Sequence, residues 1–214
     1  MIVQACINGA RPVDFHPHLP LTAAAMATDG AACIAAGAAE LHIHPRGTDG
    51  RESLAAVDET MAAVRRACPG TFIGVSTGAW IENEAQRTRR AIDGWRRLPD
   101  YASVNLSEPD APAVMDLLRK KGVGIEVGLA TVGDAHRFVG LPDTDKVLRI
   151  LIEIDIQELH AAYDVAEEIA AGHGRHPKTH PASRDRRNRL AIRRTRPQAR
   201  LVDAGRARRR QASS

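Results

Sequence analysis

The sequence alternates short apolar segments with amphipathic ones, and this alternation limits the fold more than any other feature. Six strand–helix units follow one another at intervals of about 25 to 30 residues. Regular alternation of this kind implies a parallel sheet whose strands are connected by helical crossovers. We expect the strands at residues 2–7, 40–44, 71–75, 101–105, 123–127 and 146–151. We expect the helices at residues 23–36, 54–67, 84–95, 111–121, 134–139 and 156–171.

The pattern favours the α/β class and, within it, a (β/α)8 barrel of the TIM type with about six βα units recognisable. Such a barrel typically takes about 250 residues, and this chain has 214. A doubly wound open sheet is the alternative, weakened because no Gly-rich phosphate-binding fingerprint follows the first expected strand. In a barrel, functional side chains gather at the C-terminal ends of the strands.

Two histidines mark the end of the second expected strand. Side chains alternate between the faces of a strand, so His42 and His44 point to one side while Leu41 and Ile43 pack on the other. Pro45 cannot donate to a sheet ladder and should end the strand. Neighbouring imidazoles can supply two ligands to one divalent metal ion. The alternative is a pair of strand-end histidines that bind no metal.

Polar residues also end the next three expected strands. They are Ser76 and Thr77 after the third strand, Ser103 and Asn105 on the fourth, and Glu126 on the fifth. Together with the histidines they form a site hypothesis, because four consecutive strands would deliver polar groups to the same rim. Each also has a simpler explanation: a turn at 76–78, a helix cap at 103–105, and a surface or paired carboxylate at Glu126.

Composition indicates a protein of the reducing cytoplasm. Hydrophobic residues make up 43% of the chain and aromatic residues only 3%, so the core is built from Ala, Val, Leu and Ile. No run approaches the roughly 18 apolar residues of a membrane span, and the N-terminus lacks the pattern of a signal peptide. Cys6, Cys33 and Cys68 are odd in number and far apart, which fits buried thiols better than disulfides.

The formal net charge of +4 is divided unevenly along the chain. Residues 172–214 carry 13 Arg and 1 Lys against Asp185 and Asp203, a net charge of +12, which leaves −8 for residues 1–171. We therefore expect a TIM-barrel-like catalytic domain at 1–171, incomplete by two units, and a disordered or frameshifted basic tail at 172–214.

Several segments carry a family resemblance that covers about residues 1–170. These are Asn8-Gly9-Ala10, the run 18–22, the run 36–46 with its His-x-His-x-Arg block, 74–78 and 102–105. They resemble the β-keto acid cleavage enzymes, typified by 3-keto-5-aminohexanoate cleavage enzyme. The resemblance implies a zinc-dependent TIM barrel that converts a β-keto acid and acetyl-CoA to acetoacetate and a new acyl-CoA. It also implies small-molecule partners and a homo-oligomer.

The resemblance assigns roles to individual residues. It implies that His42 and His44 are zinc ligands and that Glu126 and Arg46 belong to the catalytic residues. A bound zinc ion would polarise the keto group and stabilise the enolate that cleavage leaves. The resemblance also implies a substrate-binding set of Ser76, Thr77, Gly78, Ser103 and Asn105.

Three departures from the family pattern matter. Arg11 stands where the family often has an acidic residue that binds substrate, so an amino group on the substrate is disfavoured. Gly47 stands where an Asp often follows the His-x-His-x-Arg block. The family's third zinc ligand is a Glu in an Arg-x-Gly-x-Glu-Asp segment, which this sequence lacks, so we expect impaired activity.

Two explanations of the basic tail remain open. Permitted codons for residues 194–210, read one base later, can spell the missing Arg-x-Gly-x-Glu-Asp pattern, which suggests a single-base frameshift near codons 172–178. The alternative is a non-catalytic α/β protein whose basic tail binds nucleic acid, although nothing else in the chain is typical of a nucleic-acid-binding module.

Overall fold

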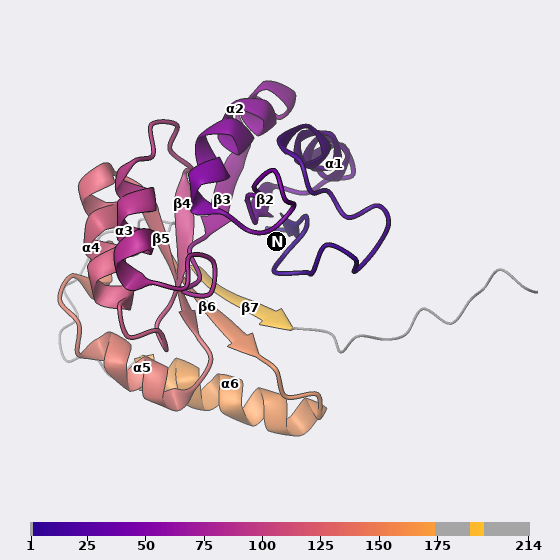
Figure 1. Ribbon diagram of the computed structural model, residues 1–214. Coiled ribbons are helices and arrows are strands. Elements are labelled where there is room, and N and C mark those ends of the chain that lie inside the picture. Colours follow the sequence, from indigo (N-terminus) through magenta and orange to yellow (C-terminus); the bar gives the residue numbers. More distant parts are fainter. Residues whose placement is uncertain (1, 174–188, 195–214) are drawn as a thin grey trace, which may run out of the picture.

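The computed structural model describes residues 2–173 and 189–194, which form one parallel sheet surrounded by helices (Figure 1). Within these residues the sheet has seven strands, and their spatial order is the order of the sequence. The strands are β1 (Gln4–Cys6), β2 (Glu40–Ile43), β3 (Phe72–Ser76), β4 (Tyr101–Asn105), β5 (Gly124–Leu129), β6 (Arg149–Ile154) and β7 (Arg189–Arg194). Because each strand pairs with its sequence neighbours, the sheet curls into part of a barrel, which confirms the predicted TIM-barrel class.

Helices connect the strands and cover the outer face of the curled sheet (Figure 1). Local sequence sets their ends: the Thr22 hydroxyl accepts from Ala25 N at the start of α1, and Thr131 and Asp134 form a capping box at the start of α5. Gly122, in the left-handed conformation, ends α4. The helices are α1 (Ala23–Ala35), α2 (Val57–Ala67), α3 (Ala85–Asp93), α4 (Ala111–Lys121), α5 (Val132–Val139) and α6 (Leu159–His173), with short 3-10 turns at Leu54–Ala56 and Thr144–Lys146.

The two faces of the sheet differ sharply in polarity. Outward side chains of β2 to β6, such as Leu41, Ile43 and Val127, are completely buried against the helices and form the hydrophobic core. The alternate positions face the concave side and are largely polar, as Glu40, His42, Ser103 and Glu126 are. The period-2 pattern of each strand therefore places the core outside the sheet and leaves its inside for chemistry.

Most elements lie close to their predicted positions, and β4 and α4 match them residue for residue. The sixth strand was predicted too early, at 146–151, and lies at Arg149–Ile154. The reason is local: Asp143 has a left-handed backbone and residues Thr144–Lys146 form a 3-10 turn, so the apolar run begins before the strand does.

The basic tail contains an element that the sequence analysis did not expect. Residues 172–173 end α6, and β7 pairs in parallel with β6 from Arg149↔Arg189 to Ile154↔Arg194. The remainder of the predicted disordered tail lies outside the described residues. No helix in the described ranges is long and apolar enough to cross a membrane.

Gly74 on β3 is required by its neighbour on β4. The two residues are register partners, and a Cβ atom at position 74 would overlap the ring of Tyr101. That ring is fully buried, and its hydroxyl accepts from Gln4 Nε2 at 2.6 Å and donates to Leu41 O at 3.3 Å. The ring therefore has no room to move aside without losing these bonds.

We expect Gly74→Ala to lower the free energy of unfolding by about 1–3 kcal/mol, the usual cost of overpacking. Gly133→Ala is the matched control, because its Cβ would meet only Thr131 Oγ1 at 3.4 Å on the helix α5. The control should be neutral or stabilising by up to about 1 kcal/mol. Urea denaturation of both variants measures the difference, and equal stabilities would contradict the proposed fit of Tyr101 on Gly74.

Candidate functional site

A cavity of about 400 Å³ opens at the C-terminal ends of the strands, on the concave side of the sheet. We call it the rim pocket. Its lining comes from every strand between β1 and β6 or from the loop that follows it, as expected of a barrel active site. The lining residues are Gln4, Gly9, Ala10, Arg11, His42, His44, Ser76, Trp80, Ser103, Asn105, Glu126, Leu151, Glu153, Asp155 and Gln157.

The two histidines lie side by side in this pocket. Their ring centroids are 5.3 Å apart, and both residues are at most 6% exposed. The side chain of Asn8 fixes the backbone of His44: its Oδ1 accepts from His44 N at 2.9 Å and its Nδ2 donates to His44 O at 2.8 Å. The chain therefore keeps the direction of the strand for one residue after β2 ends, so both imidazoles face the pocket.

A buried carboxylate orients His44. Nδ1 of His44 lies 2.5 Å from Oε1 of Glu52, whose Oε2 accepts from Trp80 Nε1 at 2.9 Å. Burial raises the pKa of Glu52, but the bonds from His44 and Trp80 and the nearby charge of Arg46 outweigh burial and lower it. Because a carboxylate only accepts, Nδ1 of His44 carries the proton and Nε2 keeps the electron pair that a metal would take.

A second buried network holds Glu126. Nε of Arg149 donates to Oε2 of Glu126, and Nη1 of the same guanidinium lies 2.5 Å from Oε1 of Glu40. The guanidinium also stacks 4.6 Å above the ring of Tyr101. Oε1 of Glu126 lies 4.0 Å from Nδ1 of His42. Burial raises the pKa of Glu126, and Arg149 opposes this shift.

The predicted substrate-binding residues divide into two groups. Ser76, Ser103 and Asn105 line the rim pocket, and Ser76 and Ser103 are register partners on β3 and β4. Thr77 lies below the surface and donates through Oγ1 to Ser103 O at 2.7 Å. Gly78 provides room for Trp80, because a Cβ atom at this position would overlap the indole.

Arg46 lies beside the rim pocket but is not part of its lining. Its guanidinium donates to three backbone carbonyls: Gly9 at 2.6 Å, Arg11 at 3.0 Å and Gly50 at 3.2 Å. These bonds tie the loop after β1 to the loop after β2, so in this structure Arg46 supports the wall of the pocket.

Sequence reasoning missed several charged residues of this region. Glu153 and Asp155 line the pocket, but the misplaced sixth strand assigned them to a loop. Alternation along a strand ending at Ile154 would have put Glu153 on the polar face. Glu52, Arg149 and Glu108, which accepts from Asn105 Nδ2 at 3.1 Å, have no such local signal.

The rim pocket offers two suitable metal ligands but not a complete ligand set. Two neutral imidazoles at a strand end are suitable zinc ligands, and the Glu52–His44 contact is the usual support for such a ligand. Within residues 2–173 and 189–194, however, no group of three His, Cys, Asp or Glu side chains is arranged to hold a metal.

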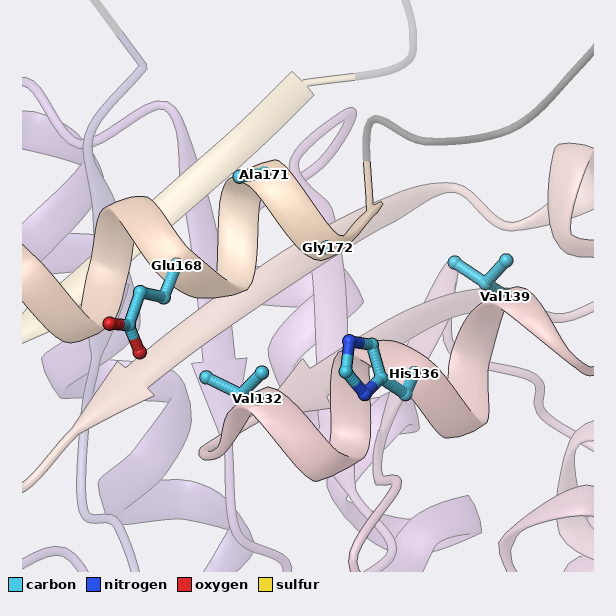
Figure 2. Close-up of a pocket in the computed structure, with 6 residues that line it drawn as sticks. All are labelled: Val132, His136, Val139, Glu168, Ala171 and Gly172. Carbon is cyan, nitrogen blue, oxygen red and sulfur yellow. The ribbon is translucent and has the colours of Figure 1, made fainter.

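A separate cavity of about 430 Å³ lies between α5 and α6, in the outer helical layer (Figure 2). His136 from α5 and Glu168 from α6 are its polar members, and the rest of its lining is Val132, Val139, Ala171 and Gly172. It contains none of the predicted site residues, and the rim pocket remains the candidate site.

Solved structures similar to this one share its fold. Type I 3-dehydroquinate dehydratase from Clostridium difficile matches with a TM-score of 0.61 and 11% identity, over 90% of this chain and 74% of that chain. The dehydratase from Geobacillus kaustophilus matches with 0.60 and 10%, over 89% and 72%. A protein described as a mandelate racemase/muconate lactonizing enzyme from Sorangium cellulosum matches with 0.54 and 18%, over 91% and 46%.

At these identities the structural matches establish the barrel-type fold alone. The sequence itself matches the family model of the beta-keto acid cleavage enzymes over residues 1–205, nearly the whole chain. The His-x-His strand end, with Ser76, Ser103, Asn105 and Glu126 around the same pocket, lies within this match. The chain is therefore a member of the beta-keto acid cleavage enzyme family.

Proposed function

We propose that the rim pocket binds zinc and a β-keto acid, and that the chain acts in the cytoplasm on this acid together with acetyl-CoA to give acetoacetate and a new acyl-CoA. The observation that supports this most strongly is the buried His42–His44 pair, with ring centroids 5.3 Å apart and His44 oriented by Glu52. A zinc ion bound there would polarise the keto oxygen of the substrate.

The chain's own residues would position the substrate and move its protons. Ser76, Ser103 and Asn105 supply hydroxyl and amide donors on the wall of the pocket and would bind the substrate carboxylate. Glu126 would hold a proton at Oε1, the oxygen that faces His42, while Arg149 fixes Oε2. Arg46 would keep the loops after β1 and β2 in place through its three carbonyl bonds.

We further propose that this chain is an impaired member of its family. Structural and catalytic zinc sites use three or four protein ligands, and two histidines alone bind the ion weakly. The Arg-x-Gly-x-Glu-Asp segment that resemblance associates with the third ligand is absent from the sequence. We therefore expect weak zinc binding and slow turnover.

Zinc titration of the purified chain tests the metal proposal. His42→Ala should lower zinc affinity by more than roughly 100-fold, since loss of a ligand costs more than the 10–100-fold loss of an outer-shell partner. His136→Ala, in the α5–α6 cavity, should leave zinc affinity unchanged.

Equal zinc affinity in the wild type and His42→Ala would contradict the metal site. Acetyl-CoA-dependent consumption of β-keto acids, followed by mass spectrometry of the new acyl-CoA, then tests the reaction itself. A panel that differs in the group beyond the keto carbon identifies the substrate.

A further inference from the structure

Trp80 lies where two cavities meet at the C-terminal end of the sheet. It lines the rim pocket, and it also lines an adjoining cavity of about 870 Å³ that the loops after β1, β2 and β3 form. Ala10 and Arg11 also belong to both linings. A ligand group that extends from the rim pocket into the adjoining cavity therefore passes these three residues.

The indole of Trp80 is exposed but held in one position. The residue is 45% exposed, whereas Trp95 is 5% exposed and packs in the core. Nε1 of Trp80 donates to Oε2 of Glu52 at 2.9 Å, and the benzene ring of the indole lies over Gly78, where a Cβ atom would overlap it. The polar atom of the side chain is thus bound within the protein. The indole offers a ligand an apolar surface that loses little conformational entropy on binding.

The acidic residues at the end of β6 are distant from Trp80 in the order of the sheet. Glu153 lies on β6 and Asp155 directly follows it, whereas Trp80 follows β3. The strands β4 and β5 separate β3 from β6. Close to Trp80, the carboxylate of Glu52 is engaged by the indole and by His44. This side of the pocket therefore favours an apolar group over a cationic one.

We propose that Trp80 is a specificity-determining residue, which selects β-keto acids with an extended apolar chain beyond the keto carbon. This inference rests on the proposed function, in which the keto group binds beside the two histidines. The carboxylate and the keto group would occupy the rim pocket, and the chain would leave it along the indole into the adjoining cavity. Each methylene group that the indole shields from water would raise the affinity by about fourfold.

An anionic substituent is the alternative to an apolar chain. Arg11 lines the same two cavities, and a second carboxylate at the end of the chain would bind its guanidinium. That guanidinium stacks 4.7 Å from the centre of the Phe15 ring, and Phe15 is itself 45% exposed. The indole of Trp80 is held by a hydrogen bond and by close packing on Gly78, so it is the better preorganised of the two groups.

Isothermal titration of the full chain with acetoacetate, 3-oxohexanoate and 3-oxooctanoate, in the presence of zinc chloride, tests the proposal. The affinity of the wild type should rise about fourfold for each added methylene group. Trp80→Gln carries an amide that can still donate to Glu52 but lacks the apolar face, so the increase should fall below about twofold. Trp80→Phe keeps an aromatic face and should retain most of the increase. The control is Tyr163→Ala, an exposed aromatic residue of α6 outside both cavities, which should match the wild type.

Two comparisons decide the role of Trp80. Equal chain-length dependence in Trp80→Gln and Tyr163→Ala would overturn the inference, as would a flat series or the absence of binding in the wild type. 3-Oxohexanoate and 3-oxoadipate have chains of equal length and differ only in a terminal methyl or carboxylate group. Tighter binding of 3-oxoadipate would overturn the inference and assign the selection to Arg11 instead. Far-UV circular dichroism confirms that each variant is folded.

The keto group separates this inference from the proposed function. Hexanoate has the same chain as 3-oxohexanoate but lacks the keto oxygen, so it should bind more weakly, and the difference should vanish in His42→Ala. Equal binding of the two acids by the wild type, with a chain-length dependence that Trp80→Gln abolishes, would support the role of Trp80 and argue against the proposed function. A His42-dependent preference for the keto acid with a flat chain-length series would support the proposed function and overturn the role of Trp80.

Discussion

Arg149→Met is expected to lower the free energy of unfolding by about 3–5 kcal/mol, the range seen when one partner of a buried ion pair is removed. Arg149 is 9% exposed, and its carboxylate partners Glu126 and Glu40 are 0% and 6% exposed. The variant would leave these two carboxylates inside the barrel without a counter-ion. Because methionine keeps most of the side-chain length, the loss would be mainly electrostatic.

Urea denaturation at neutral pH measures this effect. Arg119→Met is the matched control, because Arg119 pairs with the 61% exposed side chain of Asp116, and such a pair contributes less than about 1 kcal/mol. Adding Glu40→Gln and Glu126→Gln to Arg149→Met should recover part of the loss. If Arg149→Met loses no more unfolding free energy than Arg119→Met does, the buried network does not stabilise the fold as we expect.

The pH dependence of Arg149→Met has a definite sign. Burial raises the pKa of Glu126, and Arg149 lowers it, so removing the arginine moves the pKa further above its unfolded value. A carboxyl group whose pKa is raised on folding destabilises the protein at pH values above that pKa and ceases to do so once it is protonated. The difference in stability between the variant and the wild type should therefore shrink as the pH falls.

Glu52→Gln is expected to lower zinc affinity by about 10–100-fold without unfolding the chain. The amide can still accept from Trp80 Nε1, but it no longer holds His44 with a negative charge 2.5 Å from Nδ1. His44 would lose its fixed tautomer and orientation, and Nε2 would become a poorer ligand.

Competition with a chelator measures this change in zinc affinity. Glu82→Gln is the control, because Glu82 lies on the same rim and accepts from Leu54 N but does not touch His44. An affinity in Glu52→Gln equal to that of Glu82→Gln would show that Glu52 does not support a metal ligand.

Most of the fold could be predicted from the alternation of apolar and polar residues in the strand segments. Alternating apolar residues predicted β4 correctly and placed Leu41 and Ile43 in the core, because alternation is a local property of a strand. The same reasoning brought His42 and Glu126 to one rim, since the C-terminal ends of parallel strands meet at one edge. The roles of these residues remain predictions.

The supporting residues could not be predicted in this way, because their contacts join distant parts of the chain. Glu52 meets Trp80 across 28 positions, and Arg149 meets Glu40 across 109. Hydrophobic periodicity carries no information on such pairs. Composition was also a poor guide to the tail: it suggested a disordered or frameshifted segment from residue 172, yet the short run Arg189–Arg194 forms a strand, and the family match extends to residue 205.

The bond between Arg149 and Glu40 has a consequence for how the molecule unfolds. A sheet in which each strand pairs only with its chain neighbours can fray from either end, one unit at a time, as solenoid proteins do. Arg149 on β6 and Glu40 on β2 are separated by three intervening strands, and their ion pair bridges the concave side of the sheet directly. This ion pair couples β2 to β6, so the strands from β2 to β6 should unfold as one cooperative unit, and the folded sheet should keep the curvature on which the rim pocket depends.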